Sequence, residues 1–357
     1  MVPASDRPRE VTIADVARHA GVSVGSVSNY LTGTKRQTEA TREAVRRAMQ
    51  ELGYEPNVNA RSLRAQETRT IGLVLPNIIN PFFTDLAAVT ERRAWERGYQ
   101  VLLCSSLEDA ETETRQVRSL HQRRVDGALV VATARSEFRD PARSMPFPTV
   151  FMDRQIPDRT SVGTDNVLGG RLAAEHLVGL GHPRIGVVIG DPTLGNIQDR
   201  LTGFEQVLAQ HGRTLDERHR FAGPQSLETG LAAHALWDQP EPPTAVFVTN
   251  DIVALGLWRA LTARALRVPE DVSLVGFDDV RWLDIAGRSL TTVRQDVDRI
   301  AGQALDLLLA RVEATTTDHP PTRDLIEPTL VVRESTSPAT ASGSTGRQPP
   351  DQARHRS

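Results

Sequence analysis

The chain has 357 residues, of which 39% are hydrophobic and 24% are charged, and its net charge is −3. This composition is typical of a globular protein and excludes a wholly disordered chain, while the length favours more than one folding unit. No apolar run reaches the ~20 residues of a membrane span. The single cysteine, Cys104, excludes an internal disulfide. The N-terminal residues are charged and resemble no secretory signal. Together these features predict a cytoplasmic protein.

The charge is unevenly distributed along the chain. Residues 1–64 have an excess of three positive charges, and the remaining residues have an excess of six negative charges. A small basic end on an acidic body is the asymmetry that a DNA-binding arm produces. The excess is small, so it indicates DNA binding only together with a motif.

Three helices are predicted in the first 54 residues. Thr12 is an N-cap with an acidic residue, Asp15, three positions later, so a helix begins here and ends near residue 20, before Gly21. The second helix is expected at about residues 23–30 and the third at about residues 38–52.

The first two helices have the spacing of a helix-turn-helix. Ala17 is the small residue where the helices touch, Gly21 allows the turn, and Val27 is the branched apolar residue that meets the first helix. This triplet alone leaves a helical hairpin without a DNA role as an equal alternative.

From Thr70 onward, short apolar segments alternate with amphipathic ones. Buried strands are predicted at residues 71–75, 101–104, 127–131, 149–152, 184–189, 245–249 and 272–276. Helices are predicted between them at residues 81–97, 111–122, 167–180, 201–211, 229–237 and 252–263. The alternation predicts parallel sheets covered by helices on both faces, in two lobes. Beyond residue 333 the Ser-, Thr- and Pro-rich composition predicts a disordered tail.

The first part of the chain contains the motifs TIADVARHA, GVS, VSNYL, TEATR, LGYEPN and ARSL, and the body contains NIINPFF, FMDR, LTGF, GFDD, TTVRQD and PTLVVR. In this order these motifs resemble the LacI/GalR family of bacterial regulators over about residues 11–335. The resemblance implies a small all-α helix-turn-helix headpiece and a periplasmic-binding-protein-like α/β body with two parallel-sheet, Rossmann-like lobes.

The resemblance also implies where the parts begin and end. The headpiece is expected at residues 1–54, a hinge helix and linker at 55–69, the body at 70–333 and the tail at 334–357. Within the body, an N-lobe is expected at about residues 70–164 and 294–324, and a C-lobe at about residues 165–293 and 325–333. The chain would thus cross between the lobes three times, which makes a hinge.

The function implied is that of a sequence-specific transcription regulator, most simply a repressor, which binds a palindromic DNA operator as a homodimer. A small-molecule effector would bind between the lobes. A sugar or sugar derivative is expected, with a nucleobase or nucleoside as the alternative, and control by a protein partner stays open. An enzyme is not expected, because no nucleotide-binding glycine loop and no histidine with nucleophile or metal spacing is found. No cofactor and no metal are expected. A periplasmic solute-binding protein is disfavoured by the headpiece.

By resemblance, the second helix lies in the DNA major groove and presents Val24, Gly25, Ser26 and Asn29. Many family members have an arginine where Asn29 stands. Asparagine pairs bidentately with adenine, whereas arginine prefers guanine. Gly25 has no side chain and Val24 offers only apolar contact, so hydrogen bonding to bases is expected to be sparse.

Other residues are expected to contact DNA outside the major groove. Thr12 and Ser23 begin helices, where they can hold phosphates as well as act as N-caps, and Asn57 is a further backbone contact. In the resembled family, the leucine at the position of Leu63 wedges into the central minor-groove step. Ala60 is small enough to let two hinge helices approach each other.

The expected effector contacts come from loops at strand ends, except for Arg200, which is expected to open a helix. Sugar-binding relatives often stack an aromatic ring from the position that Gln225 occupies, so stacking would shift to Phe82, Phe83 or Trp282. Arg200 and Asp278 are the foremost candidates. The whole set is Phe82, Phe83, Asp153, Arg200, Gln225, Asn250 and Asp278.

Overall fold

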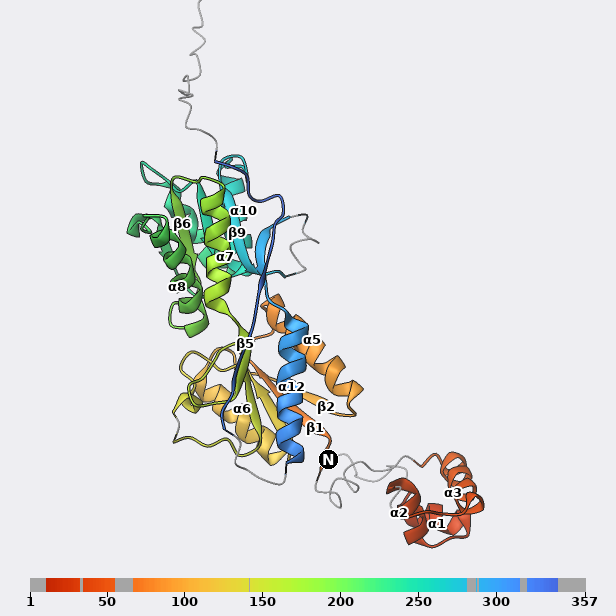
Figure 1. The fold of residues 1–357 in the computed structure, drawn as a ribbon. Coiled ribbons are helices and arrows are strands. Elements are labelled where there is room, and N and C mark those ends of the chain that lie inside the picture. The colour runs from red at the N-terminus through yellow and green to blue at the C-terminus, as the bar shows by residue number, and fades with distance from the viewer. Residues whose placement is uncertain are drawn as a thin grey trace, which may run out of the picture. The chain divides into compact units, whose positions relative to one another are not determined.

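The computed structural model describes residues 11–32, 35–54, 67–140, 142–280, 287, 289–314 and 320–339. It divides into two compact units, Met1–Thr68 and Arg69–Ser357 (Figure 1). No helix in the described ranges has the length and apolar character that a membrane crossing requires.

The first unit contains the three predicted helices, α1 (Ile13–Ala20), α2 (Val24–Thr32) and α3 (Glu39–Leu52). They enclose a small core whose fully or almost fully buried members are Val16, Ala17, Val27, Val45 and Ala48. Both Ala17 and Val27 thus lie where the helix-turn-helix spacing predicts them.

The turn between α1 and α2 depends on Gly21. This residue has a φ of 66°, a left-handed conformation that only glycine adopts without strain. Its conformation lets the Val22 amide donate to the Ala17 carbonyl at 3.0 Å, which closes the end of α1. A Cβ at this position would meet no atom within 4 Å, so the backbone conformation and not space requires the glycine.

The second unit contains two sheets with helices around them, as predicted. The sheet of the N-lobe has the order β11-β5-β4-β3-β1-β2, and all its neighbouring strands are parallel. Its strands are β1 (Thr70–Leu75), β2 (Gln100–Ser105), β3 (Gly127–Val130), β4 (Thr149–Met152), β5 (Ser161–Thr164) and β11 (Arg323–Ile326). Its helices are α5 (Pro81–Glu96), α6 (Ala110–Gln122), the 3-10 helix η1 (Glu137–Arg139) and α12 (Val297–Glu313), and α12 packs against α5 (Figure 1).

The sheet of the C-lobe has the order β12-β10-β9-β8-β6-β7, in which only β12 is antiparallel to its neighbour. Its strands are β6 (Ile185–Ile189), β7 (Arg220–Ala222), β8 (Ala245–Val248), β9 (Ser273–Asp278), β10 (Thr291–Arg294) and β12 (Thr329–Val331). Its helices are α7 (Asn166–Gly179), α8 (Gly195–Gln210), α9 (Leu227–Ala232) and α10 (Asp251–Ala263), with 3-10 helices η2 (Glu217–His219) and η3 (Ala233–Trp237).

The chain passes between the lobes at three places, from β5 to α7, from β10 to α12 and from β11 to β12. The carboxyl ends of the strands of both sheets face this crossing region, and ligands bind at such strand ends in open α/β sheets. The fold therefore places the loops after β4, β8 and β9 at the boundary between the lobes.

Two predictions are corrected by the structure. Arg200 does not open a helix, because α8 begins at Gly195 and Arg200 lies in its second turn. Residues 334–339 are not part of a disordered tail, because Ser335 is fully buried and its hydroxyl donates to the Leu274 carbonyl at 2.6 Å. His176 and His182 hold the same segment through Thr336 and the carbonyl of Ser337.

Candidate functional site

The hydroxyls at the starts of α1 and α2 both cap their helices. Thr12 and Asp15 form a capping box, in which the Asp15 carboxylate accepts from the Thr12 amide at 3.0 Å. The Ser23 hydroxyl accepts from the Ser26 amide at 3.1 Å. The N-cap role of Thr12 and Ser23 is therefore present, and their backbone amides begin helices, where phosphates are held.

The helix α2 has one face in the core and another that is accessible. Val27 is fully buried, whereas Val24 is 43% exposed although it is apolar. Gly25 is also exposed, and Ser26 and Asn29 are half-buried. The four residues predicted to meet the major groove therefore remain accessible to different degrees. Asn57, Ala60 and Leu63, which were predicted to contact DNA, lie outside the described residues, and so does Trp282.

In the second unit, Arg200 is the centre of a buried polar network. Its side chain is 2% exposed. Its Nε donates to the Asn166 side chain at 2.8 Å, and its Nη1 donates to the Thr249 carbonyl at 2.6 Å. The guanidinium also stacks on the Phe277 ring, 3.6 Å from the ring centre. These contacts fix the guanidinium at the ends of β8 and β9.

Asp278 is the carboxylate of the same network. Its Oδ1 lies 3.6 Å from Arg200 Nη1, Asn250 donates to its Oδ2 at 2.5 Å, and Gln295 donates to its Oδ1 at 2.7 Å. Gln295 in turn accepts from Thr164 at 2.5 Å. Burial raises the pKa of Asp278 to about 7, although the charge of Arg200 opposes this shift.

Asp153 follows β4 and faces the network from the N-lobe. It is 3% exposed, and its Oδ2 accepts from Asn196 of α8 at 3.3 Å. Its other oxygen, Oδ1, has no hydrogen-bond partner among the described residues. Burial raises the pKa of Asp153, whereas the nearby charges of Arg200 and Arg154 lower it. Asp153 and Asn196 thus connect the two lobes by a direct hydrogen bond.

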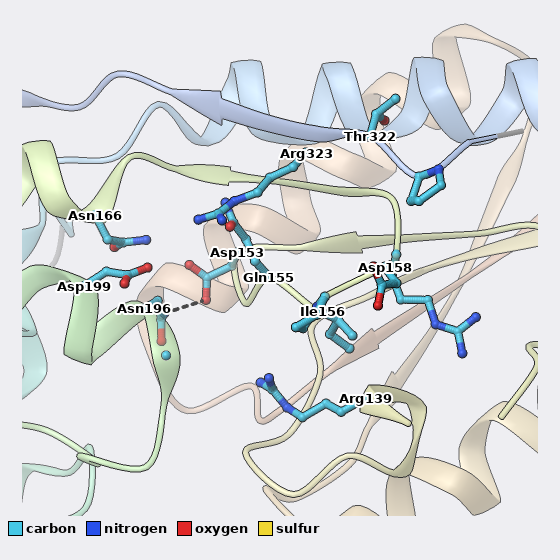
Figure 2. Close-up of a pocket in the computed structure, with 14 residues that line it drawn as sticks. Arg139, Asp153, Gln155, Ile156, Asp158, Asn166, Asn196, Asp199, Thr322 and Arg323 are labelled. Atoms are coloured by element: carbon cyan, nitrogen blue, oxygen red, sulfur yellow. Dashed lines mark hydrogen bonds between the residues drawn. The ribbon is translucent and has the colours of Figure 1, made fainter. Parts of the chain in front are cut away.

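A cavity of about 570 Å³ opens beside Asp153, Asn166 and Asn196 (Figure 2). This volume lies within the range of about 300–1,000 Å³ that is usual for small-molecule pockets. Its wall is formed by the loop after β4, by the start of α8 and by the start of β11. Its other lining residues are Arg139, Gln155, Ile156, Pro157, Asp158, Arg159, Gly195, Asp199, Pro321, Thr322 and Arg323.

The remaining predicted effector residues have different surroundings. Phe82 and Phe83 are 3% and 2% exposed and belong to the hydrophobic core, with their rings edge to face. The Arg154 guanidinium lies 5.7 Å from the centre of the Phe83 ring. The Gln225 side chain packs closely on Gly190. A Cβ added to Gly190 would lie 2.7 Å from Gln225 Cγ. That Phe82 and Phe83 contact the effector stays a prediction.

Four residues of the network were not predicted from the sequence, namely Asn166, Asn196, Thr249 and Gln295. Asn166 follows Asp165, which caps α7, and Thr249 follows β8, so their positions at element ends were a usable signal. Gln295 carried the same signal, because it directly follows β10. Asn196 had no such signal, because the start of α8 was expected at residue 201 and not at Gly195. Within the described part of the chain, no group of three His, Cys, Asp or Glu residues could hold a metal ion.

Comparison with known proteins agrees with both units. Residues 12–57 match the model of bacterial regulatory proteins of the lacI family, and residues 174–336 match the periplasmic binding protein-like domain. The chain is 34% identical over 335 residues to the HTH-type transcriptional regulator DegA of Bacillus subtilis (strain 168), which covers 92% of this chain and 99% of that protein. It is 34% identical over 313 residues to the ribose operon repressor of Escherichia coli (strain K12), which covers 85% of this chain and 94% of that one.

The solved structures agree as well. The Lac repressor dimer bound to operator and the anti-inducer ONPF superposes with a TM-score of 0.83 and 29% identity, over 92% of this chain and 100% of that chain.

Proposed function

The chain belongs to the LacI family of bacterial regulatory proteins, and from this premise we propose that it represses transcription from an operator until a sugar or sugar derivative binds between its lobes. Membership makes it a DNA-binding transcriptional regulator controlled by an effector, and not an enzyme. We further propose that it acts in the cytoplasm, as a homodimer.

One observation carries the effector proposal, namely the paired guanidinium and carboxylate at the lobe boundary. Arg200 Nη1 and Asp278 Oδ1 lie 3.6 Å apart. The pair is held by the Asn166 side chain of α7, by the backbone carbonyl of Thr249 after β8 and by the Gln295 side chain after β10. A fixed donor beside a fixed acceptor suits hydroxyl groups, which both donate and accept. Asn250 and Asp153 add an amide and a carboxylate at the same boundary. Gln225, Phe82 and Phe83 complete the proposed contacts.

The test is a thermal-shift measurement with a panel of sugars, nucleobases and nucleosides. A ligand present at 100 times its Kd stabilises the folded protein by about 2.7 kcal/mol. We expect a sugar to raise the unfolding midpoint. Arg200→Lys should abolish this rise, because lysine can neither bridge Asn166 and Thr249 nor stack flat on Phe277.

The control for this substitution is Arg184→Lys, which changes another arginine of the C-lobe, one that donates to the Pro242 carbonyl. It should keep the response to the sugar. If only a nucleobase or nucleoside raises the unfolding midpoint, the effector is of that class and not a sugar. A rise that survives Arg200→Lys would contradict the proposed site.

For the operator, we propose that α2 enters the major groove with Val24, Gly25, Ser26 and Asn29. The helix starts at Thr12 and Ser23 would hold phosphates. The accessibility of Val24 supports this arrangement, since an exposed valine beside an exposed glycine is available for apolar contact with a thymine methyl group. Asn57, Ala60 and Leu63 remain proposed contacts of the hinge.

The homodimer is supported by exposed apolar side chains on one edge of the N-lobe. Leu103 is 46% exposed in β2, which is the edge strand of its sheet, and Leu107 just after it is 72% exposed. Ile79, which follows the paired strand β1, is 85% exposed. Apolar groups gathered at a sheet edge mark an interaction surface. The occupant we propose is a second copy of the chain, in keeping with the dimeric Lac repressor structure.

A further inference from the structure

The cavity beside Asp153 is lined by polar residues that the proposed effector contacts do not include. Arg139 enters it from η1, Gln155 from the loop after β4, and Arg323 from the start of β11. Figure 2 shows the Arg323 and Arg139 side chains approaching from opposite sides of Asp153. No hydrogen bond or ion pair of the described residues engages the Arg139 or Arg323 guanidinium.

Four atoms of this wall are buried without a hydrogen-bond partner among the described residues. They are Asp153 Oδ1, Gln155 Oε1, Arg139 Nε and Arg159 Nε. Asp153 as a whole is 97% buried, being 3% exposed. A buried polar atom without a partner destabilises the folded protein, so a cluster of both donors and acceptors around one cavity indicates a ligand that satisfies them together.

The charges of the wall define the chemistry of that ligand. The positive and negative charges of the wall are equal in number. The arginines are Arg139, Arg159 and Arg323, and the aspartates are Asp153, Asp158 and Asp199. An anionic group would meet three carboxylates, and a cationic group would meet three guanidiniums. Hydroxyl groups avoid both conflicts, because each can donate to an aspartate and accept from an arginine.

The start of α8 adds to the same wall. Gly195 and Asn196 are its first residues, and Leu194 at the N-cap makes no side-chain hydrogen bond to them. The amides of a helix start favour an acceptor such as a hydroxyl oxygen.

The cavity adjoins the proposed effector site through shared hydrogen bonds. Asn166 lines the cavity and also accepts from Arg200, and Asn196 lines it and donates to Asp153. We propose that the cavity is a second subsite, which holds a further hydroxyl-rich ring, so that the effector is larger than a monosaccharide. This inference rests on the proposed function, with Arg200 and Asp278 holding one sugar unit and Arg139, Gln155 and Asp153 holding the next.

The test compares sugars in matched pairs with the full-length protein. Isothermal titration is carried out with glucose against cellobiose and maltose, with galactose against lactose and melibiose, and with glucose 6-phosphate. We expect at least one disaccharide to bind about tenfold more tightly than either of its units. Arg139→Met should remove this advantage and leave the monosaccharide Kd within about twofold of its original value.

Arg135→Met is the matched control, because Arg135 is exposed, lies in the same connection between β3 and β4 and does not line the cavity. It should leave every Kd unchanged. If Arg139→Met does not fold, Gln155→Leu takes its place, with the same expected loss.

The outcomes separate the subsite from the proposed function. A monosaccharide that binds as tightly as every disaccharide, or an Arg139→Met variant that weakens both equally, overturns the subsite and leaves the sugar sensor standing. Tighter binding of glucose 6-phosphate than of any disaccharide overturns the neutral, hydroxyl-rich assignment. If no sugar binds, both the subsite and the proposed function are wrong.

Discussion

Among the four residues proposed for the major groove, Asn29 alone carries an amide that can pair bidentately with a base edge, and its preferred partner is adenine. Asn29→Arg should therefore change the preferred base at one position of each half-site from adenine to guanine, with a discrimination of about 1–3 kcal/mol. Selection of operator sequences from a random pool measures the preference. Arg46→Lys on α3 is the control and should select the original sequence. Identical preferences for the original protein and the Asn29→Arg variant would contradict this role.

The raised pKa of Asp278 should make the stability of the protein depend on pH. Its pKa is about 7 in the folded protein against 3.8 for an ordinary aspartate. Between these values the folded protein retains a proton that the unfolded chain has released, so raising the pH from about 4 to 7 lowers the free energy of unfolding. In Asp278→Asn this titration is removed, and the unfolding midpoint should fall less over the same range.

The two proteins are compared by thermal unfolding at several pH values between about 4 and 8. Some slope should remain in the variant, because burial also raises the pKa of Asp153 and Asp251. If the unfolding midpoint changes equally with pH in the two proteins, Asp278 does not have the raised pKa.

At the scale of elements, the contact between α7 and α8 determines where Arg200 lies. A Cβ on Gly170 of α7 would be 1.9 Å from the Arg200 carbonyl, and a Cβ on Gly203 of α8 would be 1.9 Å from the Val167 carbonyl. The backbones touch at this crossing, so only glycine fits at these two positions.

Gly170→Ala should force α8 away from α7 and so displace Arg200 and Asn196. We expect destabilisation of about 1–3 kcal/mol from overpacking, with a loss of effector affinity. Gly179→Ala in the same helix is the matched control, because a Cβ there meets no atom within 4 Å. It should be neutral or stabilise the protein by up to about 1 kcal/mol, since alanine favours the helix. Equal effects of the two substitutions in chemical denaturation would exclude the proposed crossing.

Most elements could be predicted from the sequence, and the exceptions have physical reasons. The start of α8 was placed six residues too late, because Leu194 is its N-cap and provides none of the hydroxyl or carboxylate signals that mark helix starts. The strand β5 was missed because its sequence, SVGT, is too short and polar to show an apolar run. α12 was also missed, although Asp296 caps it and apolar residues recur along it at helical spacing.

The residues of the site could be predicted from the sequence only in part. Arg200, Asn250 and Asp278 were found through a resemblance of motifs. Their partners Asn166 and Gln295 come from different elements, 34 and 17 positions away from Arg200 and Asp278. Only the fold brings these residues together, so local sequence patterns do not reveal the pairs.

At the scale of the whole molecule, the proposed dimer depends on the edge of the N-lobe. Leu103→Glu would place a charge within that apolar surface, so the variant should be monomeric at concentrations where the original protein is a dimer. Val332→Glu is the control, because Val332 is 60% exposed but belongs to the C-lobe, just after β12. Sedimentation velocity measures the masses. A dimeric Leu103→Glu variant would place the interface elsewhere.

The three chain crossings provide a way for the effector to act on DNA binding. A ligand held by both lobes favours the lobe arrangement that it contacts best, and it can shift the equilibrium only by its difference in affinity for the two arrangements. Coupling between a ligand site and a distant DNA-binding unit typically changes affinity by about 5–150-fold. A sugar at Arg200 should therefore alter operator affinity within this range.

Control of DNA binding by the effector is measured through the affinity for the selected operator, by fluorescence anisotropy with and without the sugar that raises the unfolding midpoint. At fixed salt, a saturating concentration of that sugar should change the operator Kd by about tenfold or more in the original protein. In Arg200→Lys the Kd should not respond. If the operator Kd of the original protein is the same with and without the sugar, the lobes do not control DNA binding through this site.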